Sequence, residues 1–177
     1  VEAGCAVGLV GDNGAGKTTL FRCLMGSVRR DQGTVSIAGK PADAGSGDWR
    51  NHIGYVGDYH PFFDSWTAGR NLAIFSRFYT GWDSRLASSL AARLNLDLNL
   101  RVKACSTGQR SKLALITALA HRPSFLLLDE PTTGLDPVAR ESFLEILFSV
   151  MEGGETGLIY ATHHTDEIEG LADRLIF

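Results

Sequence analysis

The sequence predicts an α/β fold in which a parallel sheet is flanked by helices and carries a helical insertion. Short apolar runs alternate with segments of helical periodicity along its 177 residues. The run Phe125–Leu128 is apolar at every position, which is typical of a strand buried on both faces of a parallel sheet. This length is enough for one domain with a hydrophobic core. Ligands of such sheets bind at the carboxyl ends of the strands.

The first third of the chain interleaves strands and helices. Most of its apolar runs end at a glycine or a polar turn, which sets their boundaries. The pattern predicts a strand at Ala6–Val10, a helix at Lys17–Met25, a short strand at Thr34–Ala38, a loop at Pro41–Arg50 and a strand at Ile53–Val56.

A longer helical segment then interrupts the alternation. From about Trp66 to Leu96 apolar residues recur every three or four positions, which indicates amphipathic helices. Further helices are expected at Gln109–Ala120 and Val138–Met151, and a last strand at Gly157–Thr162. We therefore expect one domain with a core at residues 1–57 and 121–177 and a helical subdomain at residues 58–120.

Composition excludes several classes of function. The formal net charge of -3 gives no polybasic surface, so no nucleic-acid partner is expected. No apolar run approaches the ~18 residues needed to span a bilayer, so any membrane role would depend on a partner protein. The three cysteines lack the spacing of metal ligands. Because the chain begins with Val1 and enters a strand almost at once, we interpret its start as internal to a longer protein.

A glycine-rich loop follows the first predicted strand. Residues 11–18 read Gly-Asp-Asn-Gly-Ala-Gly-Lys-Thr, which fits the phosphate-loop pattern G-x-x-x-x-G-K-[ST] between a strand and a helix. The glycines let successive N–H groups turn toward phosphate oxygens, Lys17 would bind the β- and γ-phosphates, and Thr18 would bind Mg²⁺. A chance glycine turn is the alternative. The nucleotide-binding residues predicted here are Gly11, Asp12, Asn13, Gly14, Ala15, Gly16, Lys17, Thr18 and Thr19.

Two carboxylates, Asp129 and Glu130, follow the buried strand Phe125–Leu128. Asp129 can hold Mg²⁺ through water, and Glu130 is placed to orient or deprotonate an attacking water. A simple polar turn is the structural alternative, and the phosphate loop elsewhere in the chain weighs against it. Together the two motifs predict a RecA-like P-loop NTPase fold with ATP and Mg²⁺ as cofactors.

A third motif stands directly before a predicted helix. Residues 105–109 read Cys-Ser-Thr-Gly-Gln, where a serine hydroxyl, a glycine N–H and a helix N-terminus can form a second phosphate-binding surface. With these motifs the sequence resembles the ABC ATPase family over nearly its whole length, and this segment is similar to the family's LSGGQ signature. Cys105 and Thr107 depart from the family's Leu and Gly. The resemblance implies that Ser106, Thr107, Gly108 and Gln109 meet the γ-phosphate held by a second subunit, which we expect to be an identical one.

Two later segments extend the resemblance. Gly134-Leu-Asp136 is similar to the family's D-loop, which crosses the dimer interface, while Asp136 before Pro137 is also a common helix N-cap. His163 follows the last predicted strand as the family's switch histidine does, so the resemblance gives it a catalytic role beside Glu130. His164 is the neighbour that an error of one residue would select.

The resemblance weakens at Asp58. The family usually has a glutamine after a Gly-Tyr-Val-Pro stretch, and this chain reads Gly54-Tyr-Val-Gly-Asp58. Asp58 could offer an oxygen to Mg²⁺, although it also adds a negative charge beside the phosphates. A solvated loop aspartate is the alternative. The family's adenine-stacking aromatic residue lies upstream of the first residue of this chain, so we expect a chain truncated at its N-terminus.

The resemblance implies the ATPase subunit of a membrane transporter. The stretches Phe78–Asp83 and Lys103–Ser106 look like bacterial ABC-2-type exporter ATPases, which favours export. The expected partners are a second ATPase subunit and an integral membrane permease that docks on the helical insertion at the cytoplasmic face of the membrane. A soluble ABC ATPase of translation or DNA repair is the alternative, although the stretch between Asp58 and Cys105 is too short for the long coiled coil that many of these carry. A nucleotide sensor without hydrolysis is disfavoured, because both carboxylates and the lysine are present.

Overall fold

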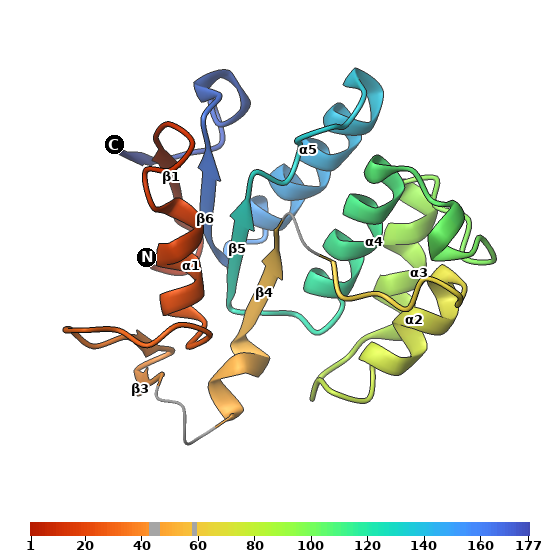
Figure 1. Ribbon diagram of the computed structural model, residues 1–177, viewed down its shortest axis with the longest axis horizontal. Helices are drawn as coiled ribbons and strands as arrows, with labels where there is room; N and C mark the ends of the chain where they lie inside the picture. The colour runs from red at the N-terminus through yellow and green to blue at the C-terminus, as the bar shows by residue number, and fades with distance from the viewer. Residues whose placement is uncertain (43–46, 58–59) are drawn as a thin grey trace.

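The centre of the protein is a five-stranded parallel sheet. The computed structural model describes residues 1–42, 47–57 and 60–177. The strands lie in the order β4-β5-β6-β1-β7 (Figure 1), and every pairing is parallel. Their bounds are Ala6–Val10 for β1, Ile53–Val56 for β4, Phe125–Asp129 for β5, Gly157–Thr162 for β6 and Arg174–Ile176 for β7. The predicted α/β fold is confirmed.

Both faces of the sheet are apolar. Alternate residues of its central strands point to opposite faces, and the residues on each face are mostly apolar. On one face, Leu127 and Ala161 pack with Phe21 of helix α1 (Lys17–Leu24). On the other face, Leu126 and Leu158 pack with the buried face of helix α5 (Pro137–Glu152). This two-sided burial explains why β5 has a continuous apolar sequence instead of an alternating one.

Three helices gather beyond β4, on the right of Figure 1. They are α2 (Ala68–Phe75), α3 (Ser84–Arg93) and α4 (Thr107–Leu119), and a 3-10 turn, η2, lies at Val102–Ala104. The helix α4 packs against β4 at Gly54, where a side chain would collide with the carbonyl oxygen of Ala118. The division of the chain into a core and a helical subdomain at residues 58 and 120 stays a prediction.

The junction between α4 and the sheet is held by His121. Its Nε2 lies 3.0 Å from the carbonyl oxygen of Ile53, and its ring stacks on Tyr79 with the centroids 4.1 Å apart. Burial lowers the pKa of His121, and two hydrogen bonds to backbone carbonyls partly offset this by raising it. A neutral imidazole protonated on Nε2 satisfies the shorter contact.

Several element boundaries differ from the sequence prediction. The helical stretch from Trp66 to Leu96 is two helices, because the chain turns after Phe75 and Asp83 caps α3 by accepting hydrogen bonds from the N–H groups of Arg85 and Leu86. The loop predicted at residues 41–50 contains part of the 3-10 helix η1 (Asp48–His52).

The short strand predicted at residues 34–38 is confined to β2 (Ser36–Ile37). It pairs with β3 (Lys40–Pro41) across Ala38 and Gly39, which both have positive φ. That geometry suits a two-residue hairpin turn.

The strand β7 was not predicted, since its three residues carry no strand pattern of their own. Asp173, just before it, accepts a hydrogen bond from the N–H of Ala6 at 2.8 Å and returns one to the Ala6 carbonyl. A further 3-10 turn, η3 (Thr165–Glu167), connects β6 to this region. Across the part of the chain that the structure describes, none of the helices is both long and apolar enough to traverse a bilayer.

Candidate nucleotide-binding site

The phosphate loop links the end of β1 to the start of α1. Gly14 and Gly16 have φ of 90° and 100°, in the left-handed region that favours glycine, and Gly16 is the N-cap of α1. Lys17 curls back over the loop, where its Nζ donates to the carbonyl oxygens of Gly11 at 2.5 Å and Asp12 at 3.2 Å. Its ammonium is thereby held at the mouth of the loop, and the residue is only 8% exposed.

Glu130 faces Lys17 from the end of β5. The carboxylate Oε1 lies 3.4 Å from the Lys17 Nζ, and the other oxygen lies 2.8 Å from Nδ1 of His163. Lys17 begins α1 after the loop that follows β1, whereas Glu130 and His163 directly follow β5 and β6, and these three strands are consecutive in the sheet. Residues far apart in sequence are therefore brought together because parallel strands end at the same edge.

Glu130 adopts an unusual backbone conformation, with φ of 48°. A side chain in the left-handed region is strained, and such residues concentrate at functional sites. The N–H of Glu130 donates to the Ala161 carbonyl at 2.9 Å, so the β5–β6 ladder continues one residue beyond β5. The turn then directs the carboxylate toward the phosphate loop.

A cavity of about 160 Å³ lies between the phosphate loop and the end of β5. Thr18 and the 3% exposed Asp129 both line it. A hydroxyl and a carboxylate are oxygen ligands of the kind that Mg²⁺ prefers. No cluster of three His, Cys, Asp or Glu residues suited to a metal is found among the described residues. One or two protein ligands are enough for Mg²⁺, because this ion usually retains waters and binds substrate phosphates. The residues lining the cavity are Asp12, Asn13, Gly14, Gly16, Lys17, Thr18, Thr19, Asp129 and Glu130.

The signature segment forms the N-terminus of α4. Ser106 is the N-cap and accepts from the N–H of Gln109 at 3.2 Å, while the Gln109 side chain accepts from the N–H of Ser106 at 2.9 Å. This capping box satisfies two of the donors left free at a helix start. None of residues 105–109 lines the phosphate-loop cavity. Figure 1 shows why, since α4 and α1 lie on opposite sides of β4 and β5.

The signature segment instead approaches the loop that follows Glu130. A Cβ on Gly134 would lie 3.3 Å from the Thr107 side chain, and one on Gly108 would lie 3.2 Å from Leu135. Asp136 caps α5 by accepting a hydrogen bond from the Ala139 N–H at 2.9 Å, so its helix-capping role is realised. A role for Asp136 across a subunit interface stays a prediction.

The structure distinguishes the two adjacent histidines. The His163 ring bonds to Glu130, whereas the His164 ring packs against the His163 ring with the centroids 3.9 Å apart. The backbone N–H of His164 donates to the Thr162 hydroxyl. Asp58, which the sequence suggested as a further magnesium ligand, lies outside the described residues, and that suggestion stays a prediction.

Sequence reasoning missed a buried polar cluster behind the site. Glu167 accepts hydrogen bonds from the hydroxyls of Tyr160 and Thr162, both at 3.2 Å, and lies 3.6 Å from Arg140. The Tyr160 hydroxyl also lies 3.2 Å from Thr132. Burial raises the pKa of Tyr160 well above its usual value. The available signal was a hydroxyl before His163 and a carboxylate four residues after it.

The fold and this edge of the sheet define a P-loop nucleotide-binding domain. The sequence profile of the family described as "ABC transporter" matches residues 1–133. The chain belongs to this family and is an ATP-binding domain of it.

Curated relatives and a solved structure agree with this placement. "Nod factor export ATP-binding protein I" of Burkholderia lata is 39% identical over 181 residues, covering 99% of this chain and 59% of that protein. The protein of the same name from Rhizobium etli is also 39% identical, with 57% of its length covered. The chain thus spans somewhat over half the length of these relatives. A solved "Structure of ATP binding subunit of ABC transporter" is 26% identical, with a TM-score of 0.89, and covers 98% of this chain and 74% of that one.

Proposed function

We propose that this chain provides the ATP-binding and hydrolysing machinery of an ABC exporter. The observation that carries the proposal is the convergence of Lys17, Glu130 and His163 at one edge of the sheet. The names of the relatives support export as the direction of transport. Because cargo selection belongs to the membrane-embedded partner in such a system, we propose no cargo.

In the proposed reaction the phosphates of ATP take over the contacts of Lys17. In the structure its ammonium donates hydrogen bonds to two neutral carbonyl oxygens. Charged phosphate oxygens are stronger acceptors, so they would replace these carbonyls. The phosphate-loop N–H groups and the start of α1 add positive potential. Thr18 and Asp129 would hold Mg²⁺, which when bound neutralises charge on the β- and γ-phosphates.

Glu130 is the proposed general base. Once Lys17 has moved to the phosphates, the Glu130 carboxylate keeps its hydrogen bond to His163 and its other oxygen turns to an attacking water. His163 orients that carboxylate and contributes a donor near the γ-phosphate. The proposed machinery is incomplete within one chain, because the Ser106–Gln109 surface lies away from the cavity. We propose that a second copy supplies this surface.

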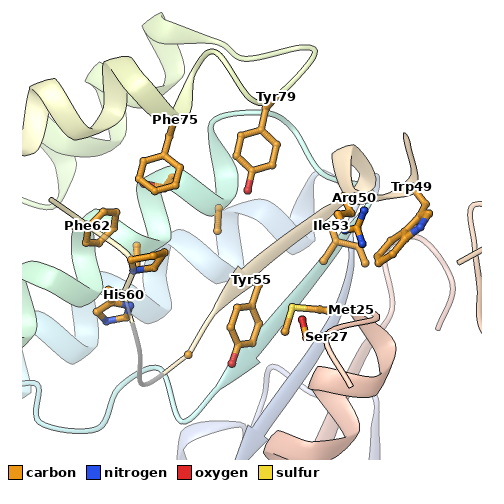
Figure 2. A pocket seen from close by; sticks show the side chains of 15 residues that line it. Met25, Ser27, Trp49, Arg50, Ile53, Tyr55, His60, Phe62, Phe75 and Tyr79 are labelled. Carbon is orange, nitrogen blue, oxygen red and sulfur yellow. The ribbon is translucent and has the colours of Figure 1, made fainter. Parts of the chain in front are cut away.

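We further propose that a permease docks between the sheet and the helical insertion, so that the protein sits at the cytoplasmic face of a membrane. A cavity of about 270 Å³ opens there. Figure 2 shows Phe75 and Tyr79 from the insertion, Tyr55 from β4 and Met25 from the end of α1 around this opening. An apolar hollow of this kind suits an apolar or aromatic anchor of a partner. Phe78, in the adjoining turn, is 71% exposed.

Glu130→Gln tests the proposed function, since it retains the shape of the side chain and removes the basic oxygen. ATP should still bind, while hydrolysis should slow by roughly 10² to 10⁴-fold. An ATP-dependent dimer should accumulate, because bound nucleotide that is not consumed favours the associated state. The measurements are nucleotide affinity, steady-state ATPase rate and sedimentation of the full-length protein.

Lys17→Ala is the matched variant for binding. It should weaken nucleotide affinity and, with it, the dimer. Hydrolysis by Glu130→Gln at the wild-type rate would contradict the role given to Glu130. Recovery of the full-length protein only with ribosomes or DNA, and never with an integral membrane protein, would favour a soluble ABC ATPase.

A further inference from the structure

The carboxylate of Glu167 is buried and does not line the nucleotide cavity. The Glu167 side chain is only 3% exposed and lies at the end of η3. Burying an ionised group is costly unless several donors surround it. Here the hydroxyls of Tyr160 and Thr162 both reach Oε2 at 3.2 Å, and Arg140 lies 3.6 Å from Oε1. The carboxylate is thus the centre of a polar cluster that joins three separate elements.

Thr162 connects this cluster to the segment that carries His163. Its hydroxyl donates to Glu167 and accepts from the backbone N–H of His164 at 2.9 Å. Its carbonyl accepts from the N–H of Gly11 at 3.4 Å, at the start of the phosphate loop. His163 is therefore flanked by two residues whose positions are fixed through one hydroxyl group.

Tyr160 connects the same carboxylate to the segment after Glu130. Its hydroxyl lies 3.2 Å from that of Thr132, which is 1% exposed, and the Thr132 carbonyl accepts from the N–H of Leu135. Arg140 extends the connection to the first turns of α5, because its backbone N–H donates to the backbone carbonyl of Asp136. One buried carboxylate thus fixes the turn bearing His163 relative to the segment between Glu130 and Asp136.

We infer that Glu167 is a positioning residue, which acts through Thr162 and Tyr160 to hold His163 against Glu130. This inference rests on the proposed ATPase function and deepens it. The contact at stake is the 2.8 Å hydrogen bond between His163 and Glu130. A shift of about 1 Å in a reacting arrangement costs on the order of 100-fold in rate, so the placement of this bond matters even though Glu167 touches no substrate.

Thr162→Val provides the sharpest test, because valine has nearly the same shape and carries a methyl group in place of the hydroxyl. We expect kcat for ATP to fall by about 10 to 100-fold while KM changes little, since the phosphate loop is intact. Glu167→Leu, which removes the acceptor of both hydroxyls, should give the same split between kcat and KM. Thr156→Val is the matched control: it removes a hydroxyl that bonds to the Pro123 carbonyl at the opposite end of β6, and it should retain wild-type kcat.

A second arm separates positioning from general destabilisation. In a His163→Ala background, Thr162→Val should cause no further loss of single-turnover rate, because the residue that it positions is already absent. Equal losses in both backgrounds would overturn the inference, and so would wild-type kcat in Thr162→Val and Glu167→Leu. A wild-type protein without ATPase activity would instead refute the proposed function, and the inference with it.

Discussion

At the scale of single residues, Glu130 must place a carboxylate at the phosphate loop and must adopt a strained backbone conformation to do so. Its side chain must leave a buried strand and reach the phosphate loop, and the backbone meets this demand with φ of 48°. An L-residue in that region costs roughly 1–2 kcal/mol relative to a right-handed conformation. The strain is retained because the flanking strand pairing and the contacts to Lys17 and His163 fix the turn.

A pair of substitutions isolates this strain. Glu130→Ala and Glu130→Gly both remove the carboxylate and its contacts, and they differ from each other by one methyl group, whose main effect is on backbone preference. We expect Glu130→Gly to be the more stable of the two by about 1 kcal/mol, because glycine adopts positive φ without a steric penalty. Urea denaturation of both variants measures the difference. Greater stability of Glu130→Ala would show that the turn is relaxed in solution.

At the scale of elements, the N-terminus of α4 has two roles to satisfy. Ser106 and Gln109 close the capping box, which stabilises the helix within its own subunit. The same Ser106 hydroxyl and helix terminus form the surface that we propose for the phosphate of a second subunit. The two roles have different electrostatic requirements, because a negative charge favours the first and opposes the second.

Ser106→Asp and Ser106→Ala should therefore separate these roles. Ser106→Ala loses the cap and should lower the free energy of unfolding by about 1 kcal/mol. Ser106→Asp retains the cap and should remain as stable as wild type, yet it should prevent the ATP-dependent dimer through repulsion of phosphate. Thermal unfolding and sedimentation with ATP read out the two effects. A dimer of normal affinity in Ser106→Asp would mean that this surface does not meet phosphate.

The elements also show where sequence is sufficient. The strands at Ile53–Val56 and Gly157–Thr162 have the bounds that were predicted, because each is a compact apolar run between polar turns. The helical stretch from Trp66 to Leu96 was predicted without internal bounds, since apolar spacing continues between α2 and α3 and only the cap at Asp83 marks the new start. Local patterns predict well which residues are buried, but they predict poorly where one helix ends and the next begins.

The candidate site also has a part that the sequence predicted and a part that it did not. Lys17, Glu130 and His163 were predicted because each belongs to a motif with a fixed order along the chain. The cluster around Glu167 was not, because it depends on side chains from four segments that meet only in the folded protein. No pattern within a single segment specifies that meeting.

At the scale of the whole molecule, the helices beyond β4 offer the surface proposed for the permease. Phe78 lies in the turn between α2 and α3 and is 71% exposed, which is unusual for a large apolar side chain. The neighbouring residues Phe75 and Tyr79 line the cavity of Figure 2. Exposed aromatic residues beside an apolar hollow are typical of protein interfaces.

Phe78→Ala tests this surface without disturbing the core. It should reduce recovery of an integral membrane partner with the full-length protein, while the ATPase rate of the isolated subunit stays unchanged. Phe148→Ala is the matched control, because Phe148 is an exposed aromatic residue on α5, outside this surface, and its loss should leave recovery intact. Crosslinking from a cysteine at position 78 would identify the partner. Equal recovery with both variants would move the docking surface elsewhere.

The order of strands in the sheet also has a consequence for biosynthesis. The strand β1 pairs with β6 on one side and with β7 on the other, so the first of these five strands along the sequence receives its neighbours last. At the ~5–20 residues per second of translation, β1 waits roughly 7 to 30 seconds before the first of these partners is synthesised. During that time its apolar residues and both of its hydrogen-bonding edges are available to other chains. The nascent chain is therefore most in need of a chaperone before β6 leaves the ribosome, whereas β5 can pair with β4 as soon as it emerges.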